Sequence, residues 1–303
     1  VGSETLGQTV GSTFDNKNVG SNKTVTVNSI TLADSSGLAA NYSISAGQTT
    51  TAHISPKSLT VSGNTASNKV YDSNSSATVS VTLSGFVGSE TLTYTNSSSF
   101  NNKNVGTGKT VTVDSITLAD GNNGGLASNY SITPGQTTTA NITAKSLIIS
   151  GIIASSKTYN GSTSATLDTS AILYSGLIPG DIFDGSYTGA FSNANVGTGK
   201  TVTITSSYTG ADVSNYSITN QTSTTADISA KALTATASAS NKTYNATNSA
   251  SVTLTLSGLV GSETLGSTNT STFNNKNVGT GKTVTVNSIT LADGSGLAAN
   301  YSI

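Results

Sequence analysis

One unit of about ninety residues recurs along this chain. The motif Val-Gly-Ser-Glu-Thr-Leu begins at Val1, Val87 and Val260, with a degenerate copy at Ile178. The motif Lys-(Ser/Ala)-Leu begins 88 and 86 residues apart, at Lys57, Lys145 and Lys231. A repeat of this length is a whole domain, much longer than one turn of a solenoid. The sequence therefore predicts a tandem array of one module.

The Lys-(Ser/Ala)-Leu motif sets the expected domain boundaries. They are a partial repeat at 1–56, complete repeats at 57–144 and 145–230, and a repeat at 231–303 that lacks its last strand. Since the sequence starts and stops in mid-repeat, we expect it to be a segment of a longer protein. Other recurring residues are taken as structural markers of the repeats: Tyr71, Tyr159, Tyr244, Asn104, Lys109, Asn195, Lys200, Asn277, Lys282, Tyr130 and Tyr216.

The composition favours a folded chain with an uncharged surface. Hydrophobic residues make up 34% of it and charged residues 9%, whereas disordered chains are usually rich in charge. The net charge is −1 and the 13 basic residues are scattered, so we expect no binding to nucleic acid or to an anionic membrane. No apolar run is long enough to span a bilayer, so this segment is expected not to insert into one.

The local patterns are those of strands and turns. In 77–83 the apolar residues Val79, Val81 and Leu83 alternate with Ser and Thr. In 110–118 the alternation changes phase at Asp114, which predicts a bulge or a bend. Seven or eight such strands per repeat predict an all-β chain, a tandem array of Ig-like, Greek-key β-sandwich domains.

The junctions between repeats contain almost no linker residues. Segments 139–147 and 225–233 run from the last strand of one repeat into the first strand of the next without Gly or Pro, and Pro56 stiffens the first junction. Such short junctions permit little bending, so we expect an elongated rod.

The sequence does not favour an enzyme. His53 is the only histidine, and Asn141 and Asp227 occupy its place in other repeats, so we interpret it as an exposed strand residue. Cys is absent, and no Gly-x-Ser-x-Gly nucleophile motif with acid and base partners is visible.

We expect no cofactor, although calcium is considered. The weak calcium candidates are Asp72, Asp120 and Asp212, but no Asp-x-Asp cluster gathers the carboxylates that calcium prefers. A turn-capping role is favoured for these acids. An isopeptide bond involving Lys103, Asn104 and Lys109 is the other chemical possibility, and a solvated turn is preferred because Ala194 replaces Lys103 in the next repeat.

An ordered series of motifs resembles a known family. In the repeat at 145–230 these are Ala-Lys-Ser-Leu at 144–147, Lys-Thr-Tyr-Asn-Gly at 157–161, Ser-Gly-Leu at 175–177, Asn-Val-Gly-Thr-Gly-Lys at 195–200 and Asn-Tyr at 215–216. Together they resemble the YDG domain of bacterial filamentous haemagglutinin-type surface proteins, in the style of mostly bacterial Ig-like repeats. No copy here carries the complete Tyr-Asp-Gly triplet, which suggests a turn that needs only a short Asp or Asn side chain.

The resemblance implies an extracellular protein of the bacterial surface that passes through an outer-membrane exporter. We expect a structural stalk of a large repetitive adhesin. The alternatives are a self-assembling matrix filament, as in a biofilm, and repeats that bind glycans or surfaces directly. The expected partners are neighbouring repeats, other copies in a filament, or a surface ligand at a distal tip.

Overall fold

A computed structural model describes residues 2–303. Val1, the first residue of the predicted partial repeat, lies outside the described residues. Within them the chain is almost entirely β-strand, with four single-turn 3-10 helices and no α-helix. This confirms the all-β prediction. The same residues include no helix long and apolar enough to cross a membrane.

The chain forms two compact units, Val1–Ala144 and Lys145–Ile303, each described by itself. The elements of residues 2–56 are β1 (Gly7–Phe14), β2 (Gly20–Ala33), η1 (Ala39–Asn41) and β3 (Thr49–Ile54). The elements of 57–144 are β4 (Lys57–Ser58), β5 (Thr60–Ala66), β6 (Lys69–Val70), β7 (Val79–Ser84), β8 (Leu92–Phe100), β9 (Gly106–Asp120), η2 (Ala127–Asn129), β10 (Tyr130–Ser131) and β11 (Thr137–Thr143).

The second unit has more and shorter strands. Residues 145–230 contain β12 (Lys145–Ser150), β13 (Ile153–Ala154), β14 (Lys157–Thr158), β15 (Ser164–Ala165), β16 (Leu167–Asp168), β17 (Leu173–Ser175), β18 (Asp184–Phe191), β19 (Gly197–Thr209), η3 (Val213–Asn215), β20 (Tyr216–Thr219) and β21 (Ser223–Ser229). Residues 231–303 contain β22 (Lys231–Ala232), β23 (Thr234–Ala239), β24 (Val252–Ser257), β25 (Leu265–Phe273), β26 (Val284–Asp293), η4 (Ala298–Asn300) and β27 (Tyr301–Ser302).

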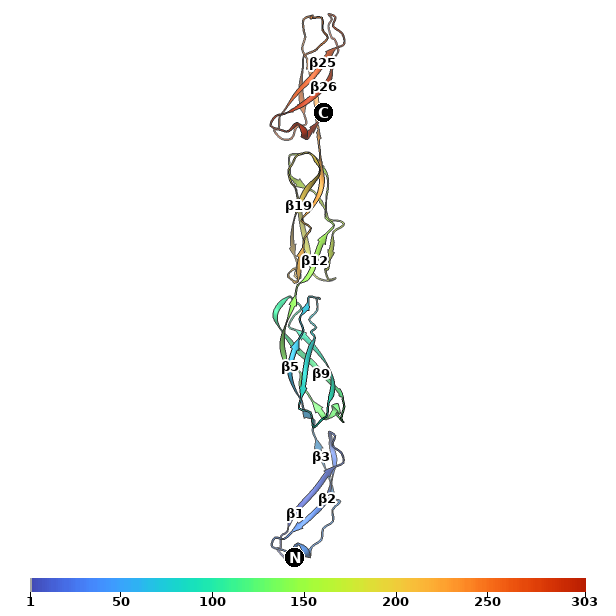
Figure 1. Cartoon of the computed structure of the whole chain (residues 1–303), viewed down its shortest axis with the longest axis vertical. Coiled ribbons are helices and arrows are strands. Elements are labelled where there is room, and N and C mark those ends of the chain that lie inside the picture. Colours follow the sequence, from blue (N-terminus) through green and yellow to red (C-terminus); the bar gives the residue numbers. More distant parts are fainter. Residues whose placement is uncertain (1) are drawn as a thin grey trace. The chain divides into compact units, whose positions relative to one another are not determined.

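The strands form several small sheets. In the first unit the sheet orders are β1-β2-β3, β10-β4, β6-β11-β9-β8 and β5-β7. In the second unit they are β17-β12-β20, β13-β16, β14-β21-β19-β18-β15, β22-β27, β23-β24 and β25-β26. Figure 1 shows β1 beside β2 and β25 beside β26, each pair joined as an antiparallel hairpin.

The first strand of each repeat pairs in parallel with the short strand at the Asn-Tyr marker. Lys57 lies opposite Tyr130 in the first unit, and Lys145 lies opposite Tyr216 in the second. A parallel pair needs a long crossover connection, and here most of the repeat lies between the two strands. The two sequence motifs that mark each repeat are therefore neighbours in space.

Alternation between apolar and polar residues decides which side chains form the core. Val79 and Val81 in β7 are each 6% exposed, and Ser80 between them faces solvent. Val111 and Val113 in β9 are fully buried, as are Val202 in β19 and Leu147 in β12. Burying an aliphatic side chain contributes roughly 1.5 to 3 kcal/mol, so these positions hold the sheets of each repeat together.

The predicted bulge is confirmed. Ser97 pairs with Ser115 but Ser98 pairs with Val113, so Asp114 is the extra residue in β9. The hairpins β1-β2 and β25-β26 have the same register shift, at Asn28 and Asn287. In a regular strand without the bulge, Ile116 and Leu118 would point to the face opposite Val111 and Val113. The bulge places them on the same face as these two valines. Repeat 145–230 differs, because β18 and β19 pair without a shift.

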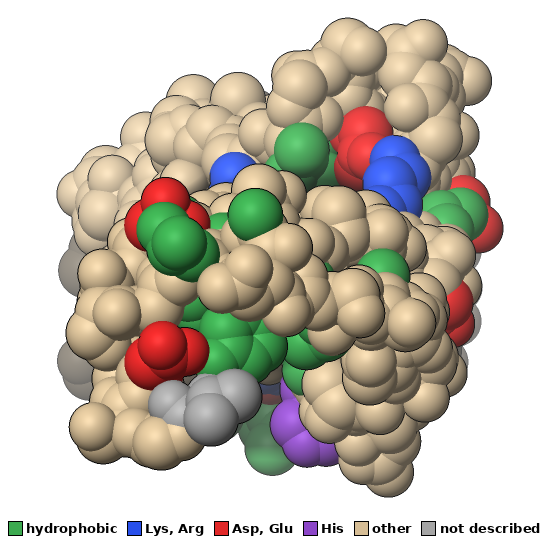
Figure 2. Space-filling view, turned by 90° about the horizontal axis from the view of Figure 1, so that it is seen from below, with side chains coloured by type: hydrophobic (Ala, Val, Ile, Leu, Met, Phe, Trp, Pro, Cys, Tyr) green, Lys and Arg blue, Asp and Glu red, His purple; other side chains and the backbone are tan. Residues whose placement is uncertain are grey.

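Uncharged side chains and backbone cover most of the face shown in Figure 2. Acidic and basic side chains are scattered over this face and form no large patch of one sign. The arrangement agrees with the low charge content of the sequence, in which 9% of residues are charged.

Deletion of Asp114 should destabilise repeat 57–144, whereas Asp114→Ala should leave it nearly unchanged. The side chain of Asp114 is exposed, but its backbone supplies the phase change that turns the half-buried Ile116 and Leu118 inward. Turning both residues outward should cost at least about 2 kcal/mol. Limited proteolysis with mass spectrometry measures this locally, and equal cleavage rates in the deletion and the substitution would contradict the role of the bulge.

Candidate functional site at the repeat junctions

The tyrosine of the Asn-Tyr marker binds the acid of the Gly-Ser-Glu marker inside each repeat. Tyr130 Oη donates to Glu90 Oε2 at 2.6 Å, and Tyr301 Oη donates to Glu263 Oε2 at 2.6 Å. The same tyrosine oxygens accept hydrogen bonds from the backbone N–H groups of Val87 and Val260. Tyr130 and Tyr301 are each 6% exposed. Each acid is therefore held in place at the end of its repeat.

The asparagine of the Asn-Tyr marker reaches across the junction to the preceding repeat. In the first unit, Asn129 Oδ1 accepts a hydrogen bond from Val19 N at 2.9 Å, and Asn129 Nδ2 donates to Asn18 Oδ1 at 3.1 Å. Both bonds join the partial repeat to repeat 57–144. The side-chain amide of Asn129 thus binds a backbone donor and a side-chain acceptor at the same time.

The junction inside the second unit repeats this geometry. Asn300 Oδ1 accepts from Val196 N at 2.9 Å, and Asn300 Nδ2 donates to Asn195 Oδ1 at 3.1 Å. Asn300 is 2% exposed, so its amide is removed from water and depends on these partners. Val278, the equivalent of Val196 in the last repeat, is 88% exposed.

The second oxygen of each glutamate binds a different donor at each junction. Lys17 Nζ lies 2.6 Å from Glu90 Oε1 in the first unit, and Tyr159 Oη donates to Glu263 Oε1 at 2.7 Å in the second. The donor differs because the residue that corresponds to Lys17 is Ala194 in the second unit, and alanine has no group that could bind the glutamate. One junction therefore contains an ion pair, and the other contains two tyrosines on one carboxylate.

These contacts shift the pKa values of the groups involved. The ammonium of Lys17 is the main cause that holds the pKa of Glu90 below its ordinary value of 4.5, and Glu90 in turn raises the pKa of Lys17. The hydrogen bond to Glu263 raises the pKa of Tyr159 to about 12. Burial is the main cause that raises the pKa of Tyr301.

The hydrophobic core of the second unit continues through its junction. A single buried cluster contains Tyr159, Phe191, Val202, Ala226 and Ile228 of one repeat with Leu233 and Tyr301 of the next. The rings of Tyr159 and Tyr301 meet edge to face, with centroids 5.4 Å apart. Such aromatic pairs contribute about 0.5 to 1.5 kcal/mol beyond area burial. The two repeats thus share core residues.

The connecting chain at each junction is short. Ala230 alone separates β21 from β22, and Ser55-Pro56 separates β3 from β4. The end of β21 is also fixed on its side, because β14 pairs with it in parallel at Ile228 and Ser229. Little of the backbone at these junctions is free of strand pairing.

The turn that gives the resembled family its name lies beside the junction in the second unit. Gly161 has φ +72°, and a Cβ atom there would lie 3.1 Å from Val260 of the next repeat. Ser73 and Ala246 occupy the same position with φ of 64° and 63°. All three copies therefore use the left-handed conformation, which favours glycine.

A lysine organises each of these turns. Lys69 Nζ donates to Asp72 Oδ1 at 2.7 Å, Lys157 Nζ to Asn160 Oδ1 at 3.0 Å, and Lys242 Nζ to Asn245 Oδ1 at 3.0 Å. Each ammonium also donates to a nearby backbone carbonyl and lies 5.2 to 5.6 Å from the ring centroid of the phenylalanine that ends β8, β18 or β25. Either Asp or Asn supplies the oxygen, so the turn accepts both.

The marker tyrosines of these turns differ in burial. Tyr71 is 1% exposed and Tyr159 is 5% exposed, and their N–H groups donate to Thr143 O and Ser229 O in the last strand of their repeats. Tyr244 is 56% exposed. The sequence ends at Ile303, before the residues that would correspond to that last strand.

The marker lysines of the Asn-Val-Gly loops bind asparagines within the same loop. Lys109, Lys200 and Lys282 donate to Asn102, Asn193 and Asn275 at 2.6, 2.7 and 2.5 Å. The isopeptide candidate Lys109 is thus placed against Asn102, while Lys103 Nζ lies 3.3 Å from Ser73 Oγ. The marker Asn104 donates its backbone N–H to the same Asn102 side chain, and Asn277 does so to Asn275.

The three calcium candidates lie in separate turns. Asp72 binds Lys69, Asp120 Oδ1 accepts from Ala127 N at 2.7 Å, and Asp212 Oδ2 accepts from Ile182 N at 3.0 Å. No group of three His, Cys, Asp or Glu side chains suited to a metal ion occurs within residues 2–303.

His53 makes the same kind of hydrogen bond as the residues that replace it in other repeats. His53 Nδ1 accepts from Asn22 N at 3.2 Å, while Asn141 and Asp227 accept from Gly108 N and Gly199 N. The donor in each case has a left-handed φ, between 54° and 59°. The position therefore needs a side-chain acceptor, which an imidazole, an amide and a carboxylate all provide.

Asn300→Ala should loosen the junction inside the second unit. The change leaves the N–H of Val196 and the amide of Asn195 without their partner, at a cost of about 1 to 3 kcal/mol for a buried polar group. Hydrogen exchange at the Val196 amide should become roughly tenfold faster or more. The Val19 amide of the first unit is the internal control, and unchanged exchange at Val196 would disprove the interaction.

Lys17→Met should change the pH response of the first junction. Because the pKa of Glu90 is lowered, the ion pair stabilises the folded state fully above pH 4.5 and loses this effect as pH falls through the lowered pKa. The pKa of Lys17 is raised, so the stabilisation that its ammonium contributes is lost only as pH rises through this raised pKa. At neutral pH the variant should show weaker protection of the Val19 amide and a smaller acid dependence, after correction for intrinsic exchange. A variant with the parental pH profile would contradict this.

Comparison with protein-family models places these features in one family. The YDG domain matches residues 1–52, 55–140, 143–226 and 229–303. No curated protein and no solved structure gave a significant match. Since the four matches together cover nearly the whole sequence, the chain belongs to the YDG domain family.

Proposed function

We propose that this chain is part of the structural stalk of a large, repetitive adhesin on the bacterial surface or secreted from it. The observation that supports the proposal is the set of contacts that join neighbouring repeats. Within each unit, consecutive repeats are joined by the asparagine of the Asn-Tyr marker and by a glutamate that binds a residue of the preceding repeat, and in the second unit also by a common core. Joints of this kind resist bending, whereas flexible linkers permit it.

We further propose that each repeat is an Ig-like, Greek-key sandwich. Its support is the division of strands in repeat 145–230, where β17-β12-β20 and β14-β21-β19-β18-β15 form separate sheets. Buried residues alternate along strands of both sheets, for example Leu147 and Ile149 in β12 and Val202 and Ile204 in β19. Sheets of this kind pack face to face through such residues.

A structural role is also supported by the use of the recurring polar residues. The repeated Lys, Asp, Asn and Glu side chains are engaged in turns and junctions, as in the bonds of Lys157, Asp120 and Glu263. These bonds maintain the fold of each repeat and its connection to the next. We therefore propose a non-enzymatic protein.

The resemblance to filamentous haemagglutinin-type proteins supports an extracellular location and export across an outer membrane. In such a protein the repeats would hold a distal binding site away from the cell, with neighbouring repeats as their main partners. A self-assembling matrix filament is the alternative, in which the same junctions would stiffen each strand of the filament.

Small-angle X-ray scattering of the full chain tests the stalk proposal. Strands of about ten residues at roughly 3.3 Å each span about 33 Å, or about 35 to 40 Å per repeat with the turns at its ends, so an extended particle of well over 100 Å is expected. A matched variant with Gly-Gly-Ser-Gly inserted after Ala230 should become more flexible. A compact, freely hinged particle for the parental chain would contradict the proposal.

A further inference from the structure

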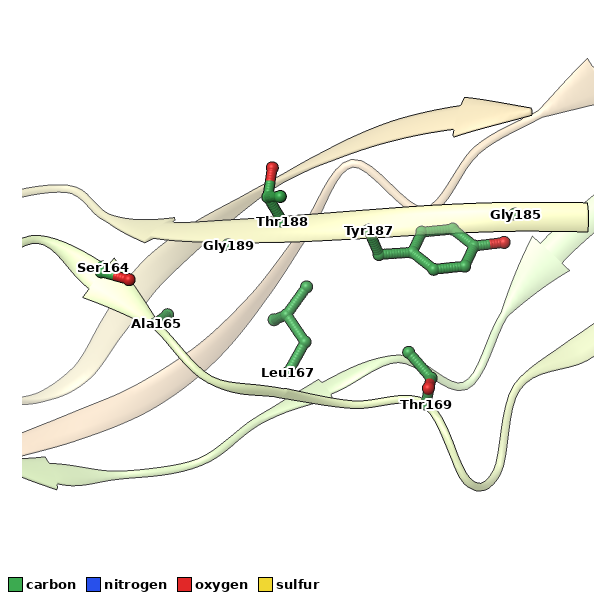
Figure 3. Close-up of a pocket in the computed structure, with 8 residues that line it drawn as sticks. All are labelled: Ser164, Ala165, Leu167, Thr169, Gly185, Tyr187, Thr188 and Gly189. Carbon is green, nitrogen blue, oxygen red and sulfur yellow. The ribbon is translucent and has the colours of Figure 1, made fainter. Parts of the chain in front are cut away.

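The repeat at 145–230 contains a groove beside strand β18. Ser164, Ala165, Leu167 and Thr169 form one wall, and Gly185, Tyr187, Thr188 and Gly189 form the other. The groove has a volume of about 370 Å³ and no charged lining residue. Figure 3 shows Ser164 and Ala165 beside Gly189, and the chain then diverging from β18 through Leu167 and Thr169. We call this wedge the β18 groove.

The groove leaves one edge of β18 without a neighbouring strand. Ser164 and Ala165 pair with Ala190 and Gly189, and beyond them β16 pairs with β13 instead. From Asp184 to Thr188, β18 therefore pairs with β19 on one side alone. Residues 184–188 have no other backbone hydrogen bond in the described structure.

Strand geometry determines which backbone groups face the groove. The N–H of Phe191 donates to Thr163 O on this side at 2.7 Å. Alternate residues of an antiparallel strand direct their N–H and C=O groups to the same side. Gly185 and Tyr187 therefore present a row of unpaired donors and acceptors to the groove, at the spacing of an extended peptide.

In the neighbouring repeats the corresponding space is closed by side chains. Asn96 Nδ2 in β8 donates to Val79 O in β7 at 3.1 Å, and Asn269 Nδ2 in β25 donates to Val252 O in β24 at 3.0 Å. Aligned on the phenylalanine that ends each strand, both asparagines correspond to Tyr187. Ser98 and Ser271, which bond to these asparagines, correspond to Gly189.

The substitutions in β18 open the groove for physical reasons. Gly189 has no side chain, and a Cβ atom there would lie 2.8 Å from Leu167 Cδ2. Tyr187 does not bridge to the opposite wall, because its hydroxyl lies 3.2 Å from the hydroxyl of Tyr174 in β17. Tyr94 in β8, whose hydroxyl donates to Val81 O in β7, corresponds to Gly185 in β18.

We propose that the β18 groove binds an extended peptide segment that adds as a strand to the open edge of β18. Unpaired backbone groups at strand spacing are what such a segment satisfies, and its main-chain hydrogen bonds supply the affinity. The inference goes beyond the proposed stalk role and does not depend on it.

The chain itself indicates the side-chain pattern of the bound peptide. In repeat 57–144, β7 faces β8 across the corresponding space and is bound to it through the side chains of Tyr94 and Asn96. The residues Val79, Val81 and Leu83 of β7 alternate with Ser and Thr. In the β18 groove the aliphatic side chains of such a peptide would contact Leu167 and the ring of Tyr187, and the hydroxyls would face water. The ligand is therefore an uncharged segment of alternating aliphatic and hydroxyl residues.

The test uses the full chain and a fluorescent peptide with the sequence of residues 77–84, Ala-Thr-Val-Ser-Val-Thr-Leu-Ser. Saturable binding by fluorescence anisotropy is expected, together with slower hydrogen exchange at the amides of Gly185 and Tyr187. Peptides N-methylated at alternate residues distinguish strand addition from side-chain binding. One alternate set should lose binding and the other should keep it, because a strand presents every second N–H to its neighbour.

Matched variants locate the site. Tyr187→Asn restores the residue that closes the other repeats and should weaken binding about tenfold or more, which corresponds to about 1.4 kcal/mol. Ser186→Asn lies on the opposite face of the same strand and should stay within twofold of the parental chain. Should Tyr187→Asn fail to fold, the N-methylated peptides on the parental chain decide the question.

Three results would overturn the proposal. The first is that the parental chain shows no saturable peptide binding. The second is that both N-methylated peptide sets lose binding equally. The third is that the peptide slows amide hydrogen exchange elsewhere, such as in β8, instead of in β18. Cellohexaose, a neutral oligosaccharide, is titrated in parallel. Competition by this sugar for the β18 groove in the absence of peptide binding would identify a glycan site instead.

Discussion

A buried side-chain amide is the interaction on which the coupling between repeats depends. Asn300 offers one acceptor and one donor to the preceding repeat, and both are matched by groups of a single loop. Because an unpaired buried amide is costly, this pairing admits one alignment of the two partners. A purely apolar contact of the same area would permit sliding, whereas these directional bonds do not.

The glutamate and tyrosine beside this amide extend its effect into each repeat. Tyr301 links Glu263 to the short strand that pairs with the first strand of the repeat, so one carboxylate connects the beginning, the end and the preceding repeat. With 34% hydrophobic residues the chain has little apolar material to use at its joints. Hydrogen-bonded polar groups, supported by the tyrosine rings, supplement the apolar core at the junctions.

Repeat 145–230 shows that a few residue differences are enough to change the structure beside one strand. Its β18-β19 hairpin has no bulge, and Gly185, Tyr187 and Gly189 replace the residues that close the space beside β8. β18 then lacks a second neighbouring strand along residues 184–188, while the junction residues Tyr159 and Asn195 bind across the joint. The hydrogen bonds of the joint come from residues outside β18, but Phe191 at the end of β18 and the groove residue Leu167 belong to or pack against the core cluster that spans the joint.

Much of the local structure could be predicted from the sequence, because strand faces and bulges depend on near neighbours. The alternation of Val79 and Val81 and the phase change at Asp114 each have a direct structural counterpart. The partners of Asn129 and Asn300 could not be predicted, since they lie 110 and 104 residues away in the chain. Recurrence showed that these asparagines belong to the repeat, but their function at the junction depends on which loop the folded chain brings to them. By itself, the sequence determined the repeat, its strands and its uncharged surface, and only the tertiary structure decided which polar residues meet.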